Sequence, residues 1–280
     1  MDPARWRFGG REFDLTARGM IMGVLNVTPD SFSDGGEYFS RDAAIAHGIA
    51  LANDGADILD VGGESTRPGA EPVPLEEEIE RVVPVLATLH EKVTSFLSID
   101  TSKATVARAA IEAGATIVND VTGGRGDVAM MSLVAERGVG FIIMHMQGTP
   151  QTMQREPKYH DVVGEVGDFF RQQYSCALSC GIDPMAIAFD PGIGFGKTLE
   201  HNLALLRNLP RLRIDDRPIV LGVSRKALLA KIIGSSEMGE RAAATIAFTS
   251  LLRDRGANVL RVHEVKDNVA ALRAAEVMRA

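Results

Sequence analysis

Several features are scarce or missing in this sequence of 280 residues, and each absence narrows the class of protein. No stretch approaches the roughly 18 consecutive apolar residues of a membrane-spanning helix, so we expect no membrane association. The opening residues, Met1 to Trp6, lack the basic and then apolar layout of a secretory signal, which favours the cytoplasm. Lysine and arginine total 30, against 37 aspartates and glutamates. This excess of negative charge disfavours nucleic acid as a partner unless the basic side chains gather in one place.

The chain has only two cysteines, Cys176 and Cys180, and it lacks the spacing of common metal motifs. The two thiols lie four residues apart in a segment with a helical pattern, where they share a face but build no disulfide framework. We interpret them as a reduced pair of small core residues, the alternative being a redox or metal role. A zinc site built from His145, His160 or His201 is disfavoured, because these histidines lack His-Glu-x-x-His or Cys-x-x-Cys spacing.

Nucleotide-binding motifs are absent as well, although the stretch GIGFGKT (Gly192–Thr198) resembles a phosphate loop. The phosphate-loop motif would require a glycine five residues before the glycine of Gly-Lys-Thr, and that position holds Pro191. The glycines also lack the spacing of a dinucleotide-binding turn. The sequence therefore predicts no nucleotide-binding loop here.

What the sequence does contain is a repeated pattern of element types. Short apolar, β-branched runs end in polar residues and are followed by segments with helical periodicity. Strands that are apolar throughout are typical of a parallel sheet covered on both faces, and eight of them predict a (β/α)8 TIM barrel. A doubly wound open sheet is the alternative architecture. The eight runs are Ile21–Asn26, Ile58–Gly63, Phe96–Asp100, Ile117–Val121, Phe141–His145, Ile187–Asp190, Ile219–Ser224 and Val259–His263.

We predict a single domain over residues 1–280, because no Pro-, Gly- or Ser-rich linker divides the chain. Within residues 1–18, the segment Trp6–Leu15 alternates apolar and polar residues about Gly9-Gly10, as a β-hairpin does. This hairpin is expected to plug the bottom of the barrel. Helical segments are expected to start at Arg41, Leu75 and Ser102, and glycine caps are expected at Gly55, Gly114 and Gly256.

Every predicted strand carries polar residues at or just beyond its carboxyl end. The active site of a (β/α)8 barrel lies on that face, so these side chains are the candidates for function. For a single position, capping of the following helix is the alternative, and Asp100-Thr-Ser-Lys103 is a good helix start. All eight strands together favour a site. The residues are Asn26, Glu64, Asp100, Asn119 with Asp120, His145, Asp190, Ser224 with Arg225 and Lys226, and Arg261 with His263.

Sorted by charge, the candidate residues indicate a substrate with two unlike ends. Asp100, Asp190 and Asn119 offer acceptors and an amide, which suit the edge of a polar ring. A group of basic residues suits an anion and would form a basic patch on an otherwise acidic protein. A flat heterocycle bearing phosphate fits both ends, the alternative being that the basic groups are ion-paired surface residues. The basic group consists of Arg67, Arg225, Lys226, Arg261 and His263.

Eight motifs follow one another in a fixed order from about residue 20 to the end of the chain. They are GVLNVTPDSFSDGG, GGESTRPGA, SIDTSK, VNDVTGG, MHMQGTP, FDPGIGFGKT, GVSRK and RVHEV. Together they resemble the dihydropteroate synthase family, which implies a transferase of folate biosynthesis on a (β/α)8 barrel. Such enzymes join 6-hydroxymethyl-7,8-dihydropterin pyrophosphate to para-aminobenzoate, release pyrophosphate, use Mg²⁺, are usually homodimers and are sulfonamide targets.

The resemblance also implies roles for individual residues, with Asn26 at the Mg²⁺. A carboxylate accepts hydrogen bonds from the amino-imide edge of a pterin, and a lysine ammonium donates to the ring, so these residue types suit the task. The residues implied for the pterin are Asp100, Asn119, Asp190, Lys226, Met144 and Phe195. Those for pyrophosphate are Thr66, Arg67, Arg261 and His263, and those for para-aminobenzoate are Phe32, Thr66, Pro68, Phe195, Lys226 and Ala227.

The mechanism implied by the resemblance is dissociative, with Asp100, Phe32 and Lys226 as the catalytic residues. Pyrophosphate leaves first, a pterin-methyl cation forms near Asp100, and the aniline nitrogen attacks it. Such a cation must be kept from water. We therefore expect the loop NVTPDSFSDGG, which holds Phe32, to close over the substrate with the loop that holds Pro68. An alternative for Phe32 is a hydrophobic anchor on the barrel rim.

The sequence departs from the family pattern at Ala227, where members commonly carry serine directly after Ser-Arg-Lys. That serine helps to hold the carboxylate of para-aminobenzoate. This chain is therefore expected to use the backbone N–H and the helix start instead.

Three rival functions are considered. A corrinoid-dependent methyltransferase resembles this barrel and its pterin site, but it has no use for the pyrophosphate residues Arg67, Arg261 and His263. A non-catalytic pterin-binding module would show losses in the loop motifs, and none is seen. A phosphosugar barrel enzyme would carry a glycine-rich phosphate site after the last two strands, which this sequence lacks.

Overall fold

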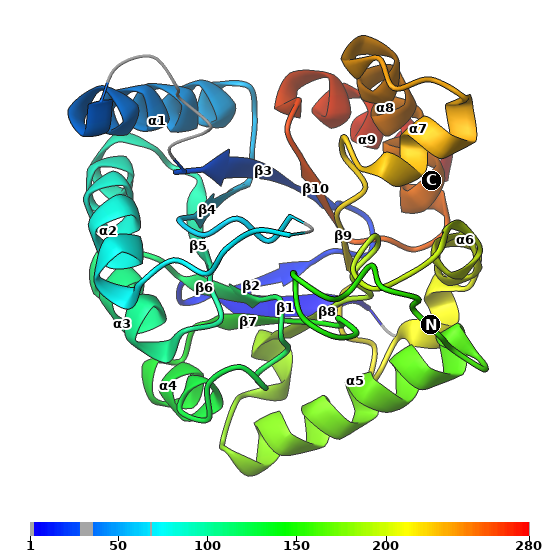
Figure 1. Ribbon diagram of the computed structural model, residues 1–280, viewed down its shortest axis with the longest axis horizontal. Helices are drawn as coiled ribbons and strands as arrows, with labels where there is room; N and C mark the ends of the chain where they lie inside the picture. The colour runs from blue at the N-terminus through cyan, green and yellow to red at the C-terminus, as the bar shows by residue number, and fades with distance from the viewer. Residues whose placement is uncertain (1–2, 29–35, 68, 280) are drawn as a thin grey trace.

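The computed structural model describes residues 3–28, 36–67 and 69–279 of the chain. At its centre eight parallel strands form a ring, and helices lie around the outside (Figure 1). The strands of the ring are β3 (Met20–Asn26), β4 (Ile58–Gly62), β5 (Phe96–Asp100), β6 (Ile117–Asp120), β7 (Gly140–Met144), β8 (Ile187–Asp190), β9 (Val220–Leu221) and β10 (Val259–Val262).

The order of the strands confirms the predicted barrel. Each strand from β3 to β8 pairs with the next one along the chain, and β10 lies between β3 and β9. A bridge between Phe189 and Ile219 joins β8 to β9, and Phe189 N donates to Pro218 O at 2.9 Å. The doubly wound alternative is wrong, because an open sheet would leave two unpaired edges where this bridge closes the ring.

The helices follow the strands as predicted, with differences at their ends. α1 begins five residues before the predicted start, and β9 is shorter than predicted because the chain turns at Val223, whose carbonyl accepts from Lys226 N. The predicted glycine caps all have positive φ angles, at 100°, 110° and 104°. The helices are α1 (Gly36–Asn53), α2 (Leu75–Lys92), α3 (Ala104–Glu112), α4 (Met130–Arg137), α5 (Val162–Ser179), α6 (Leu199–Arg207), α7 (Ala227–Ile233), α8 (Met238–Asp254) and α9 (Val265–Arg279), with short 3₁₀ turns η2 (Pro184–Ala186) and η3 (Leu209–Leu212).

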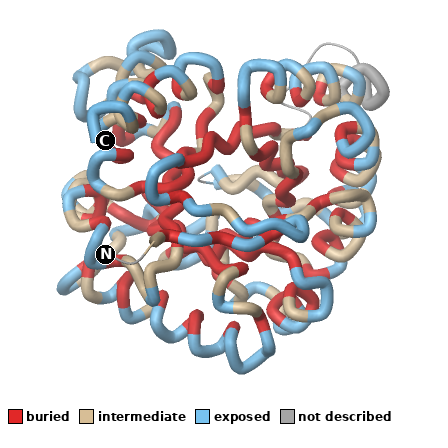
Figure 2. Tube along the Cα trace, turned by 180° about the vertical axis from the view of Figure 1, so that it is seen from behind, coloured by how far each residue is buried: buried red, intermediate tan, exposed pale blue. Residues whose placement is uncertain are grey.

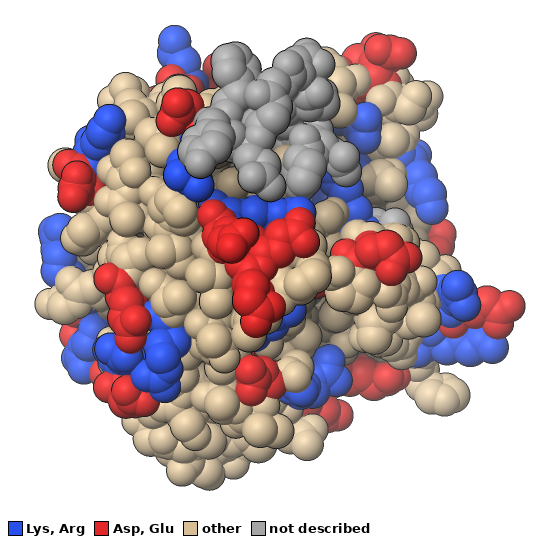
Figure 3. All heavy atoms as spheres, turned by 60° about the vertical axis from the view of Figure 1, so that its left-hand side comes forward, with Lys and Arg blue, Asp and Glu red and all other residues tan. Residues whose placement is uncertain are grey.

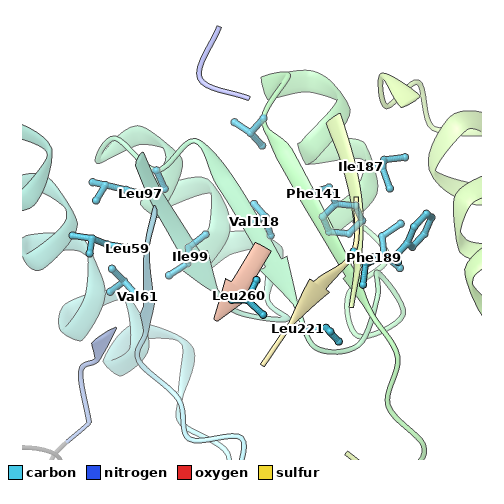
Figure 4. Packing of buried hydrophobic residues seen from close by; sticks show 14 of the residues in the cluster. Leu59, Val61, Leu97, Ile99, Val118, Phe141, Ile187, Phe189, Leu221 and Leu260 are labelled. Atoms are coloured by element: carbon cyan, nitrogen blue, oxygen red, sulfur yellow. The ribbon is translucent and has the colours of Figure 1, made fainter. Parts of the chain in front are cut away.

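Successive side chains of each strand point to opposite sides of the barrel wall. The outward set packs under the helices, as Leu59, Val61, Leu97 and Ile99 show in Figure 4. Burying this layer against the helices is the main apolar contribution to folding. Figure 2 shows the result, with buried strands inside and exposed outer helix faces.

The inward set closes the bottom of the barrel with the predicted hairpin. β1 (Arg5–Phe8) and β2 (Arg11–Asp14) pair antiparallel, and the two glycines between them have φ angles of 54° and 70°, as a type I′ turn requires. Trp6, Phe8 and Leu15 are at most 1% exposed and pack against inward residues of the ring. Trp6 Nε1 also donates to Ala186 O at 2.8 Å. The bottom is therefore filled, and the opposite end of the barrel is left for a site.

The cysteines differ from their prediction. Cys176 lies on α5 and Cys180 caps its C-terminus, and both are free and exposed rather than core residues. The helical spacing was right, but the shared face points to solvent because the other face of α5 already carries buried residues such as Val166 and Phe170.

Charge and hydropathy at the surface bear on two other expectations. On the side that Figure 3 brings forward, basic and acidic side chains are interspersed and form no continuous basic surface in the visible part. Among the described residues, no helix is long and apolar enough to cross a membrane. The cytoplasmic location and the lack of a nucleic-acid partner stay predictions.

Candidate active site

Inward-facing side chains turn from apolar to polar at the carboxyl end of the barrel. Two residues after the buried Ile58, Ile117 and Val259, the same faces of their strands carry Asp60, Asn119 and Arg261. The change follows from the strand period of two, which keeps alternate residues on the inside. Asp100, Met144 and Asp190 occupy the equivalent ends of β5, β7 and β8. The structure thus brings four predicted pterin residues, each from a different strand, to one end of the ring: Asp100, Asn119, Met144 and Asp190.

A hydrogen-bonded network joins four of these side chains. Arg261 donates from Nε to Asp60 Oδ2 at 2.6 Å and from Nη2 to Asp100 Oδ2 at 2.8 Å. Asn119 Nδ2 donates to the same Asp60 Oδ2 at 3.0 Å. Capping is therefore the wrong interpretation for Asp100, since the start of α3 is satisfied by Asp127 Oδ2, which accepts from Ala104 N at 2.9 Å.

Three acceptor atoms of this network have no partner among the described residues. Asp60 Oδ1, Asp100 Oδ1 and Asn119 Oδ1 are buried and unbonded. A buried polar atom without a partner costs about 1–3 kcal/mol, so native proteins keep few of them. Three acceptors in one place suit a ligand that presents N–H groups.

We call the network of Asp60, Asp100, Asn119 and Arg261 the floor of the site. Its electrostatics keep Arg261 charged and bring the pKa of Asp100 near neutral pH. Burial raises the pKa of Asp100 to about 7, although Arg261 opposes the shift. Burial also opposes the charge of Arg261, but Asp60 and Asp100 outweigh it and raise the pKa of Arg261 above its usual value. The ionisation of Asp100 is therefore sensitive to pH in the neutral range.

Asp190 and Lys226 form a second part of the site with the loop after β8. Asp190 Oδ1 accepts from Gly192 N at 2.7 Å, and Lys226 Nζ donates to Ile193 O. The ammonium of Lys226 also lies 4.6 Å from the ring centre of Phe195, within cation–π range. Burial raises the pKa of Asp190 and lowers that of Lys226 to about 8, and in each case the other residue opposes the shift.

An apolar wall stands beside these polar groups. Phe195 packs against a buried cluster that includes Met144, and both residues are among those implied for the pterin. The other members come from the loops after β6 and β7 and are Val121, Met146 and Met153. A wall of this kind suits the face of a flat ring.

The five basic residues gather as predicted, although two of them are also ion-paired. The pKa of His263 is lowered to about 3, first by burial and then by the positive charges of Arg225, Arg261, Arg67 and Lys226, so all four cations act on this imidazole. His263 Nδ1 lies 3.0 Å from Ser224 Oγ. Arg225 pairs with a neighbouring carboxylate, Glu264, and Arg261 with the floor aspartates. No ion pair of Arg67, Lys226 or His263 is found in the described part of the chain.

Some predicted residues cannot be placed or hold positions with little contact. Phe32 and Pro68 lie outside the described residues. Thr66 is half-buried and Arg67 exposed in the loop after β4. Ala227 is exposed and is the first residue of α7. Their roles stay predictions.

Three other strand-end residues have structural roles instead. Asp120 accepts from Thr122 N at 2.7 Å and from Gly124 N at 2.9 Å, which closes the turn after β6. Glu64 pairs with Lys103 beneath the loop after β4. His145 contacts Lys197, as described below. Polar strand ends alone therefore do not separate site residues from turn residues.

Asn26 ends β3 and is half-buried beside Gly62 of β4. In the described part of the chain its amide is not engaged by another side chain. No cluster of three His, Cys, Asp or Glu residues that suits a metal occurs among the described residues. A protein-only metal cage is thus not found there, whereas Mg²⁺ fits one amide oxygen when phosphate and water supply the other ligands. His201 completes the capping box of α6, and the exclusion of a zinc site stays a prediction.

Two residues outside the predicted set are central to the site. Asp60 lies inside the predicted apolar strand Ile58–Gly63, and the sequence signal for it is its inward position in β4. Lys197, from the stretch that resembled a phosphate loop, is only 4% exposed. Its Nζ lies 3.0 Å from His145 Nδ1 and donates to Gly192 O at 3.0 Å and Phe195 O at 2.9 Å. Burial lowers the pKa of His145 to about 2, so the ring is neutral and Nδ1 accepts. Lys197 thus holds the loop that carries Phe195.

Comparison with known proteins agrees with this geometry. The sequence profile of the family described as pterin binding enzyme matches residues 22–263. Dihydropteroate synthase of Synechocystis sp. is 44% identical over 91% of this chain and 88% of its own length. That of Escherichia coli is 42% identical over 91% and 90%.

Solved structures agree as well. Xanthomonas albilineans dihydropteroate synthase with 4-aminobenzoic acid superposes with a TM-score of 0.92, at 43% identity over 99% of both chains. Burkholderia cenocepacia dihydropteroate synthase complexed with 7,8-dihydropteroate gives 0.88, at 42% identity over 99% of this chain and 97% of that one.

Proposed function

Since this chain belongs to the pterin-binding enzyme family, among its dihydropteroate synthases, we propose a division of that reaction among the residues at the mouth of the barrel. The chain condenses 6-hydroxymethyl-7,8-dihydropterin pyrophosphate with para-aminobenzoate to give 7,8-dihydropteroate and pyrophosphate, a step of folate biosynthesis. The observation that carries the assignment is the floor of unpartnered acceptors beside a gathered set of cations.

The pterin occupies the floor and the apolar wall. Asp190 accepts from the amino-imide edge, and Lys226 donates to the ring. Asn119 and Asp100 offer their free oxygens to ring N–H groups, which supplies the partners that these buried atoms lack. Met144 and Phe195 pack against the ring face.

The pyrophosphate lies against the cations, among them Arg261 and His263, with Thr66 and Arg67 from the loop after β4. When the C–O bond to the leaving group breaks, both bonding electrons go to pyrophosphate. Fixed positive charge at that place stabilises the charge that develops in the transition state. Because His263 is neutral, it contributes as a hydrogen-bonding group, while the arginines supply the charge.

Asn26 is the residue that would hold Mg²⁺. Its amide oxygen is a hard ligand at the carboxyl end of β3, which is the chemistry that Mg²⁺ prefers. When bound, the ion neutralises phosphate oxygens of the substrate.

Departure of pyrophosphate leaves a pterin-methyl cation, and ionised Asp100 stabilises it. The lone pair of the aniline nitrogen then forms the new C–N bond, and the proton that the nitrogen loses passes to the released pyrophosphate. Asp100 suits this role because it lies at the carboxyl end of β5, with one oxygen bonded to Arg261 and the other free. Phe32 and Pro68 are proposed to shield the cation from water together with Phe195.

A coupled assay tests the function. Purified protein is supplied with the pterin pyrophosphate, para-aminobenzoate and Mg²⁺, and both pyrophosphate and dihydropteroate are followed. We expect the two products to appear together and EDTA to stop them. If the pterin pyrophosphate binds but neither product forms, the chain is a pterin-binding module and the catalytic assignment fails.

Replacing Ala227 by serine tests the aminobenzoate pocket. We expect the KM for para-aminobenzoate to fall by about two- to tenfold, because a hydroxyl at the exposed start of α7 adds a donor for the carboxylate. The KM for the pterin substrate should change less. Steady-state kinetics with each substrate varied in turn measures both values, and equal changes would refute the placement of Ala227.

We also propose that the chain forms a homodimer through α8 and α9. Leu251, Val277 and Met278 are 56%, 76% and 87% exposed on these two packed helices. Apolar side chains of this size are commonly covered by a partner. Sedimentation velocity should show a dimer for the wild type and a shift toward monomer for Leu251→Glu, with Lys266→Glu as the control on α9. A monomeric wild type would contradict the proposal.

A further inference from the structure

Asp60 is a buried carboxylate inside the barrel that the proposed division of the reaction leaves without a role. It is 0% exposed and lies on the inward face of β4 between Ile58 and Gly62. Carboxylates are almost never fully buried unless they are paired. Its surroundings therefore have to explain why the carboxylate is there.

One oxygen of Asp60 serves two residues of the site. Oδ2 accepts from Asn119 Nδ2 at 3.0 Å and from Arg261 Nε at 2.6 Å. In the ring β4 is two strands away from β6, which carries Asn119, and two strands away from β10, which carries Arg261. Asp60 thus joins the pterin-binding side of the mouth to the pyrophosphate-binding side.

The bond to Asp60 decides which end of the Asn119 amide faces the ligand. The oxygen and nitrogen ends of an asparagine amide have nearly the same shape, and only hydrogen bonds distinguish them. With Nδ2 committed to Asp60, the buried Oδ1 stays free as an acceptor. Without Asp60, the amide can turn and present a donor where the ligand also has a donor.

The same oxygen sets the direction of Arg261. A guanidinium is planar, so fixing two of its N–H groups fixes the direction of the others. Asp60 holds Nε and Asp100 holds Nη2. Because the guanidinium is planar, these two bonds also fix the directions in which its other N–H groups point.

We infer that Asp60 is a positioning residue for this reaction, which orients Asn119 toward the pterin and Arg261 toward the pyrophosphate by accepting both hydrogen bonds on one oxygen. The inference rests on the proposed function. Asp60 acts through these two neighbours, since both of its hydrogen bonds go to them.

The structure allows hydrogen bonding to be separated from charge. Because Oδ1 is without a partner among the described residues, Asp60→Asn can keep its oxygen at the place of Oδ2 and put its NH2 group at the place of Oδ1. Asp60→Leu keeps the branching at Cγ, is larger, and offers no acceptor. Ser98→Ala is the matched control, because Ser98 is buried opposite Asp60 on β5 and its hydroxyl has no partner among the described residues.

The experiment measures kcat, the KM of each substrate, and calorimetric binding of 6-hydroxymethyl-7,8-dihydropterin, which needs no turnover. For Asp60→Leu we expect pterin binding and the pterin KM to weaken roughly 10- to 100-fold, a typical cost of losing a residue that orients a ligand-binding group. The KM for para-aminobenzoate should change less than about threefold, since the bonds of Asp60 lie on the pterin and pyrophosphate side. Asp60→Asn should bind the pterin within about fivefold of the wild type, and Ser98→Ala should match it.

Several outcomes would overturn the inference. If Asp60→Asn loses as much as Asp60→Leu, charge rather than hydrogen bonding is what matters. If Asp60→Leu binds the pterin like the wild type, Asp60 positions nothing. If both KM values rise together and the thermal midpoint falls, its role is only structural. If the wild type itself binds no pterin and forms no product, the proposed function fails instead.

Discussion

Replacing Asp100 by asparagine is expected to lower kcat by about two to three orders of magnitude, the usual cost of removing one group that stabilises transition-state charge. The side chain keeps its shape, and its oxygen can still accept from Arg261 Nη2. The negative charge beside the reacting methylene is lost. We therefore expect the KM of the pterin substrate to change much less than kcat, as rapid-quench and steady-state assays would measure.

The pH dependence of the wild type gives the same residue a second readout. Burial raises the pKa of Asp100 to about 7, so below that pH the carboxyl is neutral and cannot stabilise a cation. The value of kcat/KM for the pterin substrate, which reports the free enzyme, should rise with pH through about 7. The variant should lack this acid limb.

Asp57→Asn is the control for the chemical change itself. Asp57 precedes β4 at the closed end of the barrel, where its Oδ2 accepts from Ile21 N at 2.8 Å. Its kcat and acid limb should match those of the wild type. A wild-type acid limb that survives in Asp100→Asn would assign that ionisation to another group, and an unchanged kcat would remove Asp100 from the chemistry.

Replacing Lys197 by methionine is expected to lower the free energy of unfolding by about 2–4 kcal/mol. The substitution keeps an unbranched side chain, one atom shorter, but leaves His145 Nδ1 and Phe195 O without the donor they have now. Each buried acceptor that loses its partner costs about 1–3 kcal/mol. The loop after β8 should loosen, so the pterin KM should rise as well. Urea unfolding followed by circular dichroism measures the first effect.

Lys266→Met makes the same change on the exposed face of α9, where surface substitutions stay within about 0.5 kcal/mol. It should unfold like the wild type. If Lys197→Met also unfolds at the wild-type urea concentration, Lys197 is not the anchor of this loop. A change in stability without a change in the pterin KM would separate the anchor from the positions of Phe195 and Lys226.

Local sequence patterns were sufficient to predict the barrel and its hairpin. Apolar, β-branched runs mark the eight strands because a strand covered on both faces must be apolar, and the Gly9-Gly10 pair marks the hairpin because both residues need positive φ. The carboxyl ends of the strands then point to one face of the barrel. Motif order added the roles of residues such as Asp190 and Lys226, which the structure places together.

The same patterns did not predict the burial or the role of residues whose neighbours come from other parts of the chain. Lys197 belongs to the stretch that resembles a phosphate loop but lacks its first glycine. In the structure it is a buried residue that donates a hydrogen bond to Phe195 O. Cys176 and Cys180 share a helix face, but the packing of α5 against the barrel decides that this face is exposed. Asp60 lies within an apolar strand and was not among the predicted site residues, yet it bonds to Arg261.

The sequence by itself determined the barrel, its open end and most of the residues there, because strand periodicity and polar strand ends are local properties. Only the tertiary structure decided how those residues pair. Arg261 lies 201 residues from Asp60 and 161 from Asp100, yet hydrogen bonds join all three. Local periodicity fixes whether a side chain faces inward, whereas its neighbours across the barrel depend on the order, register and closure of all eight strands.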